Sequence, residues 1–197
     1  MLNENIIKQI RDYADKNNVP IMMDEGINYL TNYILENGVK RILEVGTAIG
    51  YSAIMMCGVN SDITVTTIER DEKRYLEAVK NIKKMELEDR IDLIYNDALE
   101  VNLDGTYDLI FIDAAKAQNI KFFEKFENNL NDNGTIITDN MNFHGLVDKE
   151  ISEIESRNLR QLVRKVKNYK DFLNYNERYE TVFLDIGDGL AVSKKRK

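Results

Sequence analysis

Hydrophobic positions along the chain switch between helical spacing and short β-branched runs, and these switches mark out the predicted elements. A first helix is predicted from about Asn3 to Lys16, before Pro20 stops it. A second helix is predicted from Asp24, as its N-cap, to about Glu36. We expect residues 1–38 to cover one end of a ligand crevice that the following strands form.

Seven short apolar runs are predicted to be strands, and most of them alternate with helices such as 72–85 and 117–130. The runs are 41–45, 63–68, 91–95, 107–112, 134–138, 181–186 and 190–193. This alternation predicts an α/β fold with a mainly parallel, doubly wound sheet. The turn Gly187-Asp188-Gly189 predicts that the last two runs form an antiparallel hairpin at the sheet edge. No linker or second boundary interrupts the pattern, so we expect a single domain over residues 1–197.

The first predicted strand leads into a turn that carries Gly46 and Gly50 before a helix. Such a turn is where α/β proteins receive nucleotide-like ligands. The spacing G-x-x-x-G differs from the dinucleotide fingerprint and from the phosphate-binding P-loop. It favours a ligand with a nucleoside but no pyrophosphate, such as S-adenosylmethionine, whose cationic end Glu44 could meet. The alternative is a strand-turn-helix whose glycines serve packing alone.

Composition narrows the class of protein and of partner. The 197 residues are 43% hydrophobic with a single cysteine, Cys57, which excludes an internal disulfide and favours a reducing cytoplasm. No apolar run reaches about 18 residues, so we expect neither a signal core nor a membrane span. The net charge of −7 argues against nucleic acid, but positive charge gathers in the last quarter of the chain.

Acidic residues follow four predicted strands, at Glu69, Asp97, Asp113 and Asp139. Ligands of parallel sheets bind at this edge, so these side chains are candidate ligand contacts. We expect Glu69 to accept hydrogen bonds from ribose hydroxyls and Asp97, beside Ala98, to meet an adenine amino group. The alternative is that such acids are solvated turn formers and helix caps.

Asp113, Asp139 and Asn140 form a candidate metal site, because the strands that carry them are expected to be neighbours. Their hard oxygen donors suit Mg²⁺, Mn²⁺ or Ca²⁺ rather than zinc. Lys116, three residues beyond Asp113, could act as a general base on a metal-bound hydroxyl. The alternative is a lysine that pairs with a carboxylate at a helix start. His144, the only histidine, is assigned no catalytic role.

The runs LEVGTAIGYSA, FIDAAK and TDN, together with Glu69, resemble the divalent-metal-dependent O-methyltransferases related to catechol and caffeoyl-CoA O-methyltransferases. The likeness covers nearly the whole chain and implies a Rossmann-like class I methyltransferase fold, usually dimeric. It implies a metal held by Asp113, Asp139 and Asn140, with Lys116 as the base. The cofactor contacts it implies are Met22, Glu44, Gly46, Ser52, Glu69, Asp97, Ala98 and Asp113. The chain is shorter than these relatives at its N-terminus and around 59–62, where entry-loop contacts differ.

Within this family, the segments IERDEKRYLEAVKNIKK, RNLRQLVRKV and GDGLAVS resemble the bacterial branch that methylates 5-hydroxyuridine at the tRNA wobble position. Four cations recur at helical spacing and would form a stripe for a phosphate backbone, namely Arg157, Arg160, Arg164 and Lys167. Nearby aromatics, expected to stack on RNA bases, are Tyr169, Phe172, Tyr175 and Tyr179. The alternative for this stripe is a solvated face of an amphipathic helix.

The sequence thus predicts Mg²⁺-dependent methyl transfer from S-adenosylmethionine to a hydroxyl oxygen, with the tRNA anticodon loop as the substrate. A small catechol-type substrate for the same site is the first alternative. A non-catalytic module that binds a nucleotide and RNA is the second.

Overall fold

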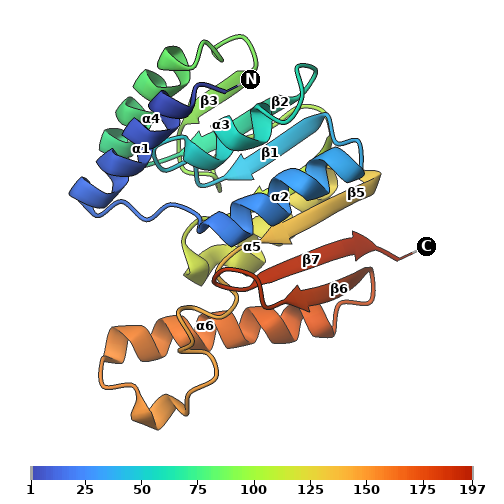
Figure 1. Cartoon of the computed structure of the whole chain (residues 1–197). Helices are drawn as coiled ribbons and strands as arrows, with labels where there is room; N and C mark the ends of the chain where they lie inside the picture. Colours follow the sequence, from blue (N-terminus) through green and yellow to red (C-terminus); the bar gives the residue numbers. More distant parts are fainter. Residues whose placement is uncertain (1, 197) are drawn as a thin grey trace.

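A seven-stranded sheet runs through the part of the chain that the computed structural model describes, residues 2–196 (Figure 1). Its order is β3-β2-β1-β4-β5-β7-β6. Five strands are parallel, whereas β7 pairs antiparallel with β5 and with β6. The strands are β1 (Arg41–Val45), β2 (Thr64–Glu69), β3 (Ile91–Tyr95), β4 (Tyr107–Ile112), β5 (Leu130–Thr138), β6 (Tyr179–Leu184) and β7 (Leu190–Lys195). The predicted doubly wound sheet with a C-terminal hairpin is confirmed.

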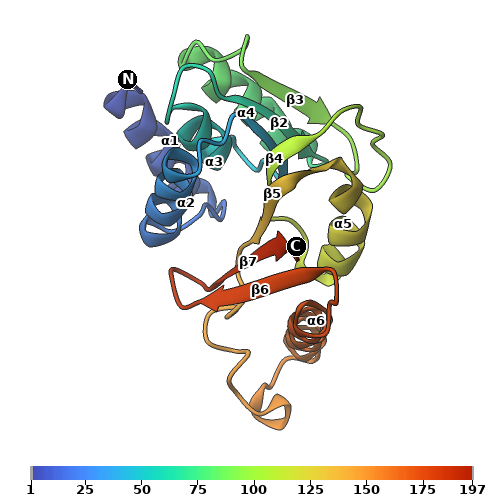
Figure 2. The same cartoon turned by 90° about the vertical axis from the view of Figure 1, so that its right-hand side faces the viewer.

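Helices cover both faces of this sheet. They are α1 (Glu4–Asn17), α2 (Asp24–Glu36), α3 (Tyr51–Cys57), α4 (Glu72–Lys84), α5 (Asn119–Phe126) and α6 (Arg157–Asn174), with 3₁₀ turns η1 (Lys116–Gln118), η2 (Glu127–Asn129) and η3 (Ile151–Glu153). The turned view separates α2 and α3 from α5 and α6 across the sheet (Figure 2). Among residues 2–196, no helix is both long and apolar enough to cross a lipid bilayer.

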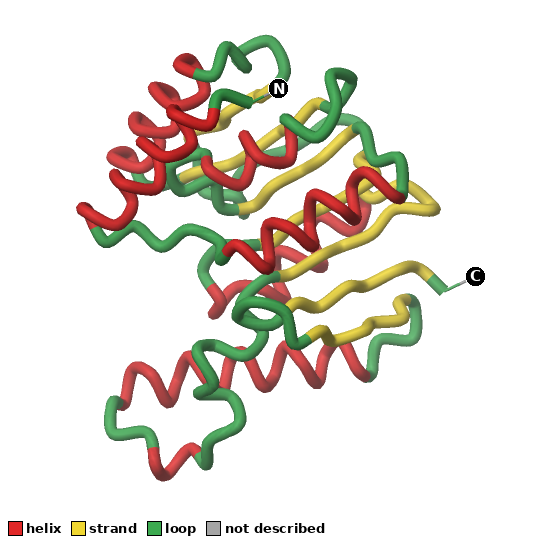
Figure 3. The backbone as a smooth tube through the Cα atoms, viewed as in Figure 1, coloured by secondary structure: helices red, strands yellow, loops and turns green. Residues whose placement is uncertain are grey.

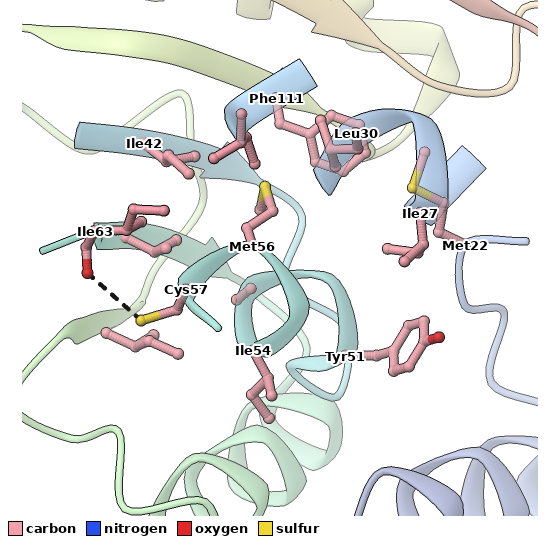
Figure 4. Packing of buried hydrophobic residues seen from close by; sticks show 14 of the residues in the cluster. Met22, Ile27, Leu30, Ile42, Tyr51, Ile54, Met56, Cys57, Ile63 and Phe111 are labelled. Carbon is pink, nitrogen blue, oxygen red and sulfur yellow. Dashed lines mark hydrogen bonds between the residues drawn. The ribbon is translucent and has the colours of Figure 1, made fainter. Parts of the chain in front are cut away.

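Alternate residues of the central strands feed two apolar cores, because successive side chains of a strand point to opposite faces. On one face, Ile42 of β1 and Phe111 of β4 pack beneath α2 and α3 (Figure 4). On the other face, Leu43 and Ile110 pack with residues of α5 and α6. The two cores hold the carboxyl ends of β1 and β4 side by side, where the sequence places its ligand turn.

The predicted element ends are wrong in two places. Asp24 is the first residue of α2, and Met23, with an extended backbone, occupies the N-cap position without a side-chain bond. The Asp24 carboxylate pairs with Arg11. The predicted helix 117–130 is shorter, since α5 lies between two 3₁₀ turns and β5 already begins at Leu130. Leu130 pairs with Tyr107 across a register shift, and this contact between strands leaves no periodic signal in the sequence.

The longest irregular segment connects β5 to α6 and contains only η3 (Figure 3). It starts beside the carboxyl end of β5 and ends at the N-terminus of α6, which Ser156 caps by accepting from the Leu159 N–H. Three of its residues in 140–144 have a positive φ, which L-residues adopt only at a cost. This segment therefore requires specific tertiary contacts to hold its shape.

Candidate active site

The turn after β1 brings two strand ends into direct backbone contact. Gly46 has a φ of +101°, and a side chain at this position would collide with the backbone of Asp113 at the end of β4. Gly50, with a φ of +86°, occupies the N-cap position of α3. Glycine serves at both positions because positive φ carries no steric penalty without a Cβ. The result is an opening between the carboxyl ends of the central strands.

A cavity of about 350 Å³ lies at this opening, a size typical of small-molecule sites. Segments from six parts of the chain line it, namely 20–23, 45–48, 68–74, 96–98, 113–122 and 139–144, together with Asp188. Most of the predicted site residues are in its lining, namely Met22, Gly46, Glu69, Asp97, Ala98, Asp113, Lys116, Asp139 and Asn140. The fold therefore gathers residues that are separated by more than a hundred positions in the sequence.

Glu69 and Asp97 stand in one part of the wall. The Glu69 carboxylate accepts hydrogen bonds from the N–H groups of Ala48, at 2.8 Å, and Asp71, at 2.7 Å, so it also fixes the turn after β1. Asp97 accepts from the Leu99 N–H at 2.9 Å and forms an ion pair with Arg70 at 3.2 Å. Both carboxylates border the cavity, as the sequence predicts for ribose and adenine contacts.

Glu44 and Ser52 lie behind the cavity lining. Glu44 is fully buried, and its two carboxylate oxygens accept hydrogen bonds from the hydroxyls of Ser52 and Thr67. Burial raises the pKa of Glu44 to about 7, against the opposing effect of these hydroxyls. Because neither residue reaches the lining, their direct contact with a ligand stays a prediction.

The three predicted metal ligands meet beside Lys116. The Lys116 ammonium donates a hydrogen bond to Asn140 Oδ1 at 2.7 Å, and the Asn140 N–H donates to Asp139 Oδ1 at 2.6 Å. Burial and the neighbouring charge of Asp113 raise the pKa of Asp139 to about 7. Burial also raises the pKa of Asp113, although the charge of Lys116 opposes this. Negative charge is therefore concentrated in a poorly solvated corner of the cavity.

This corner suits a hard cation by its donor atoms. In residues 2–196, no three Asp, Glu, His or Cys side chains are grouped to hold a metal ion. The corner instead offers two carboxylates, of Asp113 and Asp139, and the amide oxygen of Asn140. Mg²⁺ commonly uses one or two carboxylates and keeps water or substrate oxygens in its other positions. A dication would also offset the repulsion between the buried carboxylates.

Asp188 belongs to the site although the sequence did not predict it. It lies in the β6–β7 turn, is 7% exposed and borders the cavity. Its carboxylate accepts from the His144 N–H at 2.5 Å and from the Asn140 side-chain amide at 3.2 Å. Its place in Gly187-Asp188-Gly189 is typical of a hairpin turn, so the sequence contained no separate signal of a role at the site.

The segment between α1 and α2 forms one wall of the cavity, with Pro20 and Met22 in the lining. Arg11 of α1 holds this segment in place by bonding to the carboxylate of Asp24 and to the hydroxyl of Tyr51. Tyr51 is itself 2% exposed and belongs to the core beneath α3. The N-terminal helices thus contribute to the cavity wall through a specific side-chain tie.

Only part of the predicted basic stripe on α6 is free to meet a partner. Arg157 and Arg164 are exposed, whereas Arg160 donates to the carbonyl oxygens of Ile154, at 2.6 Å, and Glu155. Lys167 similarly donates to the Lys149 carbonyl oxygen at 3.3 Å. Two of the four cations therefore hold the β5–α6 segment against the helix.

The prediction that aromatic side chains near the basic stripe stack on RNA bases is wrong for two residues. Tyr169 and Tyr179 are 1% and 2% exposed and pack edge-on against Phe123 of α5. The Tyr169 hydroxyl also lies 2.8 Å from the Thr138 hydroxyl oxygen. Tyr169 lies on the face of α6 that packs into this core, and Tyr179 enters the same core as the first residue of β6. Tyr175, by contrast, is 83% exposed.

Solved structures with a similar fold include proteins described as methyltransferases. A Staphylococcus aureus protein described as "a putative caffeoyl-CoA O-methyltransferase" is 44% identical, with a TM-score of 0.92 over 96% of this chain and 92% of its own. A Bacillus cereus O-methyltransferase in complex with SAH shares the fold, with a TM-score of 0.84, 24% identity, and coverage of 98% of this chain and 92% of its own.

A plant enzyme, caffeoyl-CoA O-methyltransferase of Populus kitakamiensis, is 26% identical over 96% of this chain and 86% of its own length. The model of a family described as O-methyltransferase matches residues 2–196. This match covers almost the whole chain, and the fold places a cavity at the strand ends. The chain therefore belongs to the O-methyltransferase family.

Proposed function

We propose that this protein transfers the methyl group of S-adenosylmethionine to a hydroxyl oxygen that lies next to a second oxygen on its substrate, with a divalent cation. Family membership supports the reaction class, and the SAH-bound Bacillus cereus relative supports the donor. The observation that carries the proposal is the single cavity in which Glu69 and Asp97 stand with Asp139, Asn140 and Lys116.

In this proposal the nucleoside of the donor occupies the part of the cavity near Glu69 and Asp97. Glu69 accepts hydrogen bonds from the ribose hydroxyls, since a carboxylate has acceptor capacity beyond the backbone N–H groups that it already binds. Gly46 lets the backbone approach the ligand closely. The sulfonium methyl then faces the corner formed by Asp113 and Asp139.

Asp113, Asp139 and Asn140 would hold the cation, and their oxygen donors fit Mg²⁺ or Mn²⁺. Such a cation would supply a Lewis acid that lowers the pKa of the substrate hydroxyl. Lys116, as the neutral amine, takes the hydroxyl proton. A lone pair of the substrate oxygen forms the new O–CH₃ bond while the S–CH₃ bond breaks. The electron pair of the broken bond stays on sulfur, which becomes a neutral thioether. Much of the acceleration comes from orientation of the two reactants in the cavity.

We propose 5-hydroxyuridine at the wobble position of tRNA as the substrate, because it presents a hydroxyl beside a carbonyl oxygen. The exposed cations Arg157 and Arg164 support an RNA partner, since they can neutralise backbone phosphates. The N-terminal end of α6 lies toward the end of the molecule at which the parallel strands finish (Figure 1). The exposed Tyr175 remains available for base stacking.

A small catechol-type substrate is the second candidate. The burial of Tyr169 and Tyr179 favours it, because the protein then offers fewer aromatic surfaces to RNA than the sequence predicts. The name of the Populus kitakamiensis relative also supports it. Both candidates use the same corner and the same proton transfer. The structure gives no support to a non-catalytic module, since the four side chains proposed for catalysis and metal binding line one cavity. They are Asp113, Lys116, Asp139 and Asn140.

The test is incubation of the protein with labelled S-adenosylmethionine and either tRNA containing 5-hydroxyuridine or a catechol, with Mg²⁺ or with EDTA. We expect Mg²⁺-dependent label in the tRNA and loss of turnover in Asp139→Ala. The matched control is Asp132→Ala, which removes an exposed carboxylate of β5, the strand that Asp139 follows, away from the cavity. Label in the catechol alone would identify the small catechol-type molecule as the substrate. Full activity in EDTA would refute the requirement for a divalent cation.

A further inference from the structure

The side-chain amide of Asn140 lies between two groups of opposite hydrogen-bonding character. Its Oδ1 accepts from the Lys116 ammonium at 2.7 Å, and its Nδ2 donates to Asp188 Oδ2 at 3.2 Å. An ammonium group has only donors and a carboxylate has only acceptors. One orientation of the amide satisfies both neighbours, and the flipped orientation satisfies neither. The carbonyl oxygen therefore faces Lys116.

Asp188 is fixed in place by the backbone of the segment after β5. The His144 N–H donates to its Oδ1 at 2.5 Å, and the Asn142 N–H donates to its carbonyl oxygen at 2.8 Å. Its neighbour Gly189 accepts from the Met141 N–H at 2.9 Å. The β6–β7 turn thus clamps residues 140–144, where positive φ values require such support.

We propose that Asp188 is a positioning residue that keeps the carbonyl oxygen of Asn140 turned toward Lys116. The consequence for the cation rests on the proposed function, because only the carbonyl oxygen of an amide ligates a hard cation and its NH₂ group does not. Without Asp188, the hydrogen bond from Lys116 alone would orient the Asn140 amide among the described contacts.

The isosteric change Asp188→Asn separates this role from mere packing. The His144 N–H requires an acceptor, so the oxygen of the introduced amide takes that position and its NH₂ group faces Asn140. Asn140 can then satisfy only one neighbour: Lys116 if its amide stays in place, or the amide of residue 188 if it flips. The change therefore removes the preference for one orientation and lets the flipped amide be populated, although the shape of residue 188 is unchanged.

The first experiment uses the metal-free protein and measures nuclear Overhauser contacts of the Asn140 side-chain NH₂ protons. In the wild type we expect stronger contacts to the His144 backbone amide than to the Lys116 methylenes. In Asp188→Asn we expect the contacts to the Lys116 methylenes to strengthen relative to those to His144. Stronger contacts to Lys116 than to His144 already in the wild type would overturn the proposal, even if the variant failed to fold.

The second experiment measures Mn²⁺ affinity by electron paramagnetic resonance. Loss of a group that orients a metal ligand typically weakens affinity 10–100-fold, and we expect about that loss in Asp188→Asn. Asp185→Asn is the matched control, since Asp185 accepts from the Asn142 side chain at 2.8 Å in the same hairpin but does not contact Asn140. We expect its affinity to stay within about twofold of the wild type. Equal affinity in both variants would overturn the role of Asp188.

A charge-conserving double variant, Asn140→Asp with Asp188→Asn, provides a rescue. Both oxygens of the introduced carboxylate are acceptors, so one faces the cavity in either orientation. We expect Mn²⁺ affinity to recover to within about tenfold of the wild type, and failure of this rescue counts against the proposal. Absence of Mn²⁺ binding by the wild type would instead refute the cation of the proposed function, while the proton contacts still decide the role of Asp188.

Discussion

A Cβ atom on Gly46 would lie 2.3 Å from the carbonyl oxygen of Asp113, so the ends of β1 and β4 touch backbone to backbone. This contact forms the floor of the cavity, because it brings the nucleoside-binding turn against the carboxyl end of β4. A side chain at Gly46 would force the two strand ends apart.

Gly46→Ala is therefore expected to destabilise the protein and to abolish S-adenosylmethionine binding. Positive φ costs about 1–2 kcal/mol for a non-glycine residue, and the collision with the Asp113 backbone adds about 1–3 kcal/mol. Gly38→Ala is the control, since Gly38 has a φ of +62° with nothing within 4 Å of its Cβ position. Chemical denaturation should show only the cost of positive φ in Gly38→Ala. Equal losses of unfolding free energy in both variants would refute the close contact between Gly46 and the Asp113 backbone.

Glu44→Gln is expected to change how stability depends on pH. The pKa of Glu44 is raised from about 4.5 to about 7 by burial, so the folded state holds a proton that the unfolded state has lost. The corresponding stability is fully present below about pH 4.5 and is lost as pH rises through about 7, a loss on the order of 3 kcal/mol. Denaturation of the metal-free protein should show the free energy of unfolding of Glu44→Gln rising relative to that of the wild type between about pH 4.5 and 7. If the two free energies change with pH in parallel, the raised pKa of the buried Glu44 carboxylate is contradicted.

Lys116→Met is expected to lower turnover about a hundredfold or more, because it removes the proposed base. S-adenosylmethionine affinity, measured by calorimetry, should remain within about twofold. Lys116→Arg should stay inactive as well, since a guanidinium does not lose its proton near neutral pH. Lys121→Met, an exposed change on α5, serves as the control. An active Lys116→Arg would assign Lys116 an electrostatic role instead.

Charge reversal of Arg157 and Arg164 tests the RNA surface. Both side chains are exposed on α6, so we expect weaker tRNA binding and a shallower salt dependence, by about one unit of slope per lost phosphate contact. Thermal stability should be unchanged. Reversal of Lys83 and Lys84, exposed near the end of α4, is the matched control for net charge. Identical binding by both double variants would exclude α6 from the RNA surface.

Local patterns were sufficient for most of the fold and for the edge at which the site forms. Short apolar runs that alternate with helical spacing require a sheet with helices on both faces, and acids after successive runs must then meet at one edge. Asp113 and Asp139 are brought into one cavity for this reason. The same reasoning placed Glu69 and Asp97 in the wall, since Glu69 ends β2 and Asp97 lies two residues beyond the end of β3.

Local patterns failed where one residue type suits two roles or where a contact joins distant segments. The ring of Tyr169 could stack on a base or pack in a core, and only packing against Phe123 decides that it is buried. Leu130 follows a helix in sequence, yet pairing with Tyr107 makes it the start of a strand.

By itself, the sequence determined the α/β architecture and the acidic edge of the sheet, because strand and helix periodicities are properties of neighbouring residues. Only the tertiary structure decided that Glu44 lies behind the cavity wall, and that Asp188 reaches Asn140 from a hairpin 48 residues away along the chain. Burial and hydrogen-bond partners depend on which segments meet in space, and the spacing of residues along one segment does not contain that information.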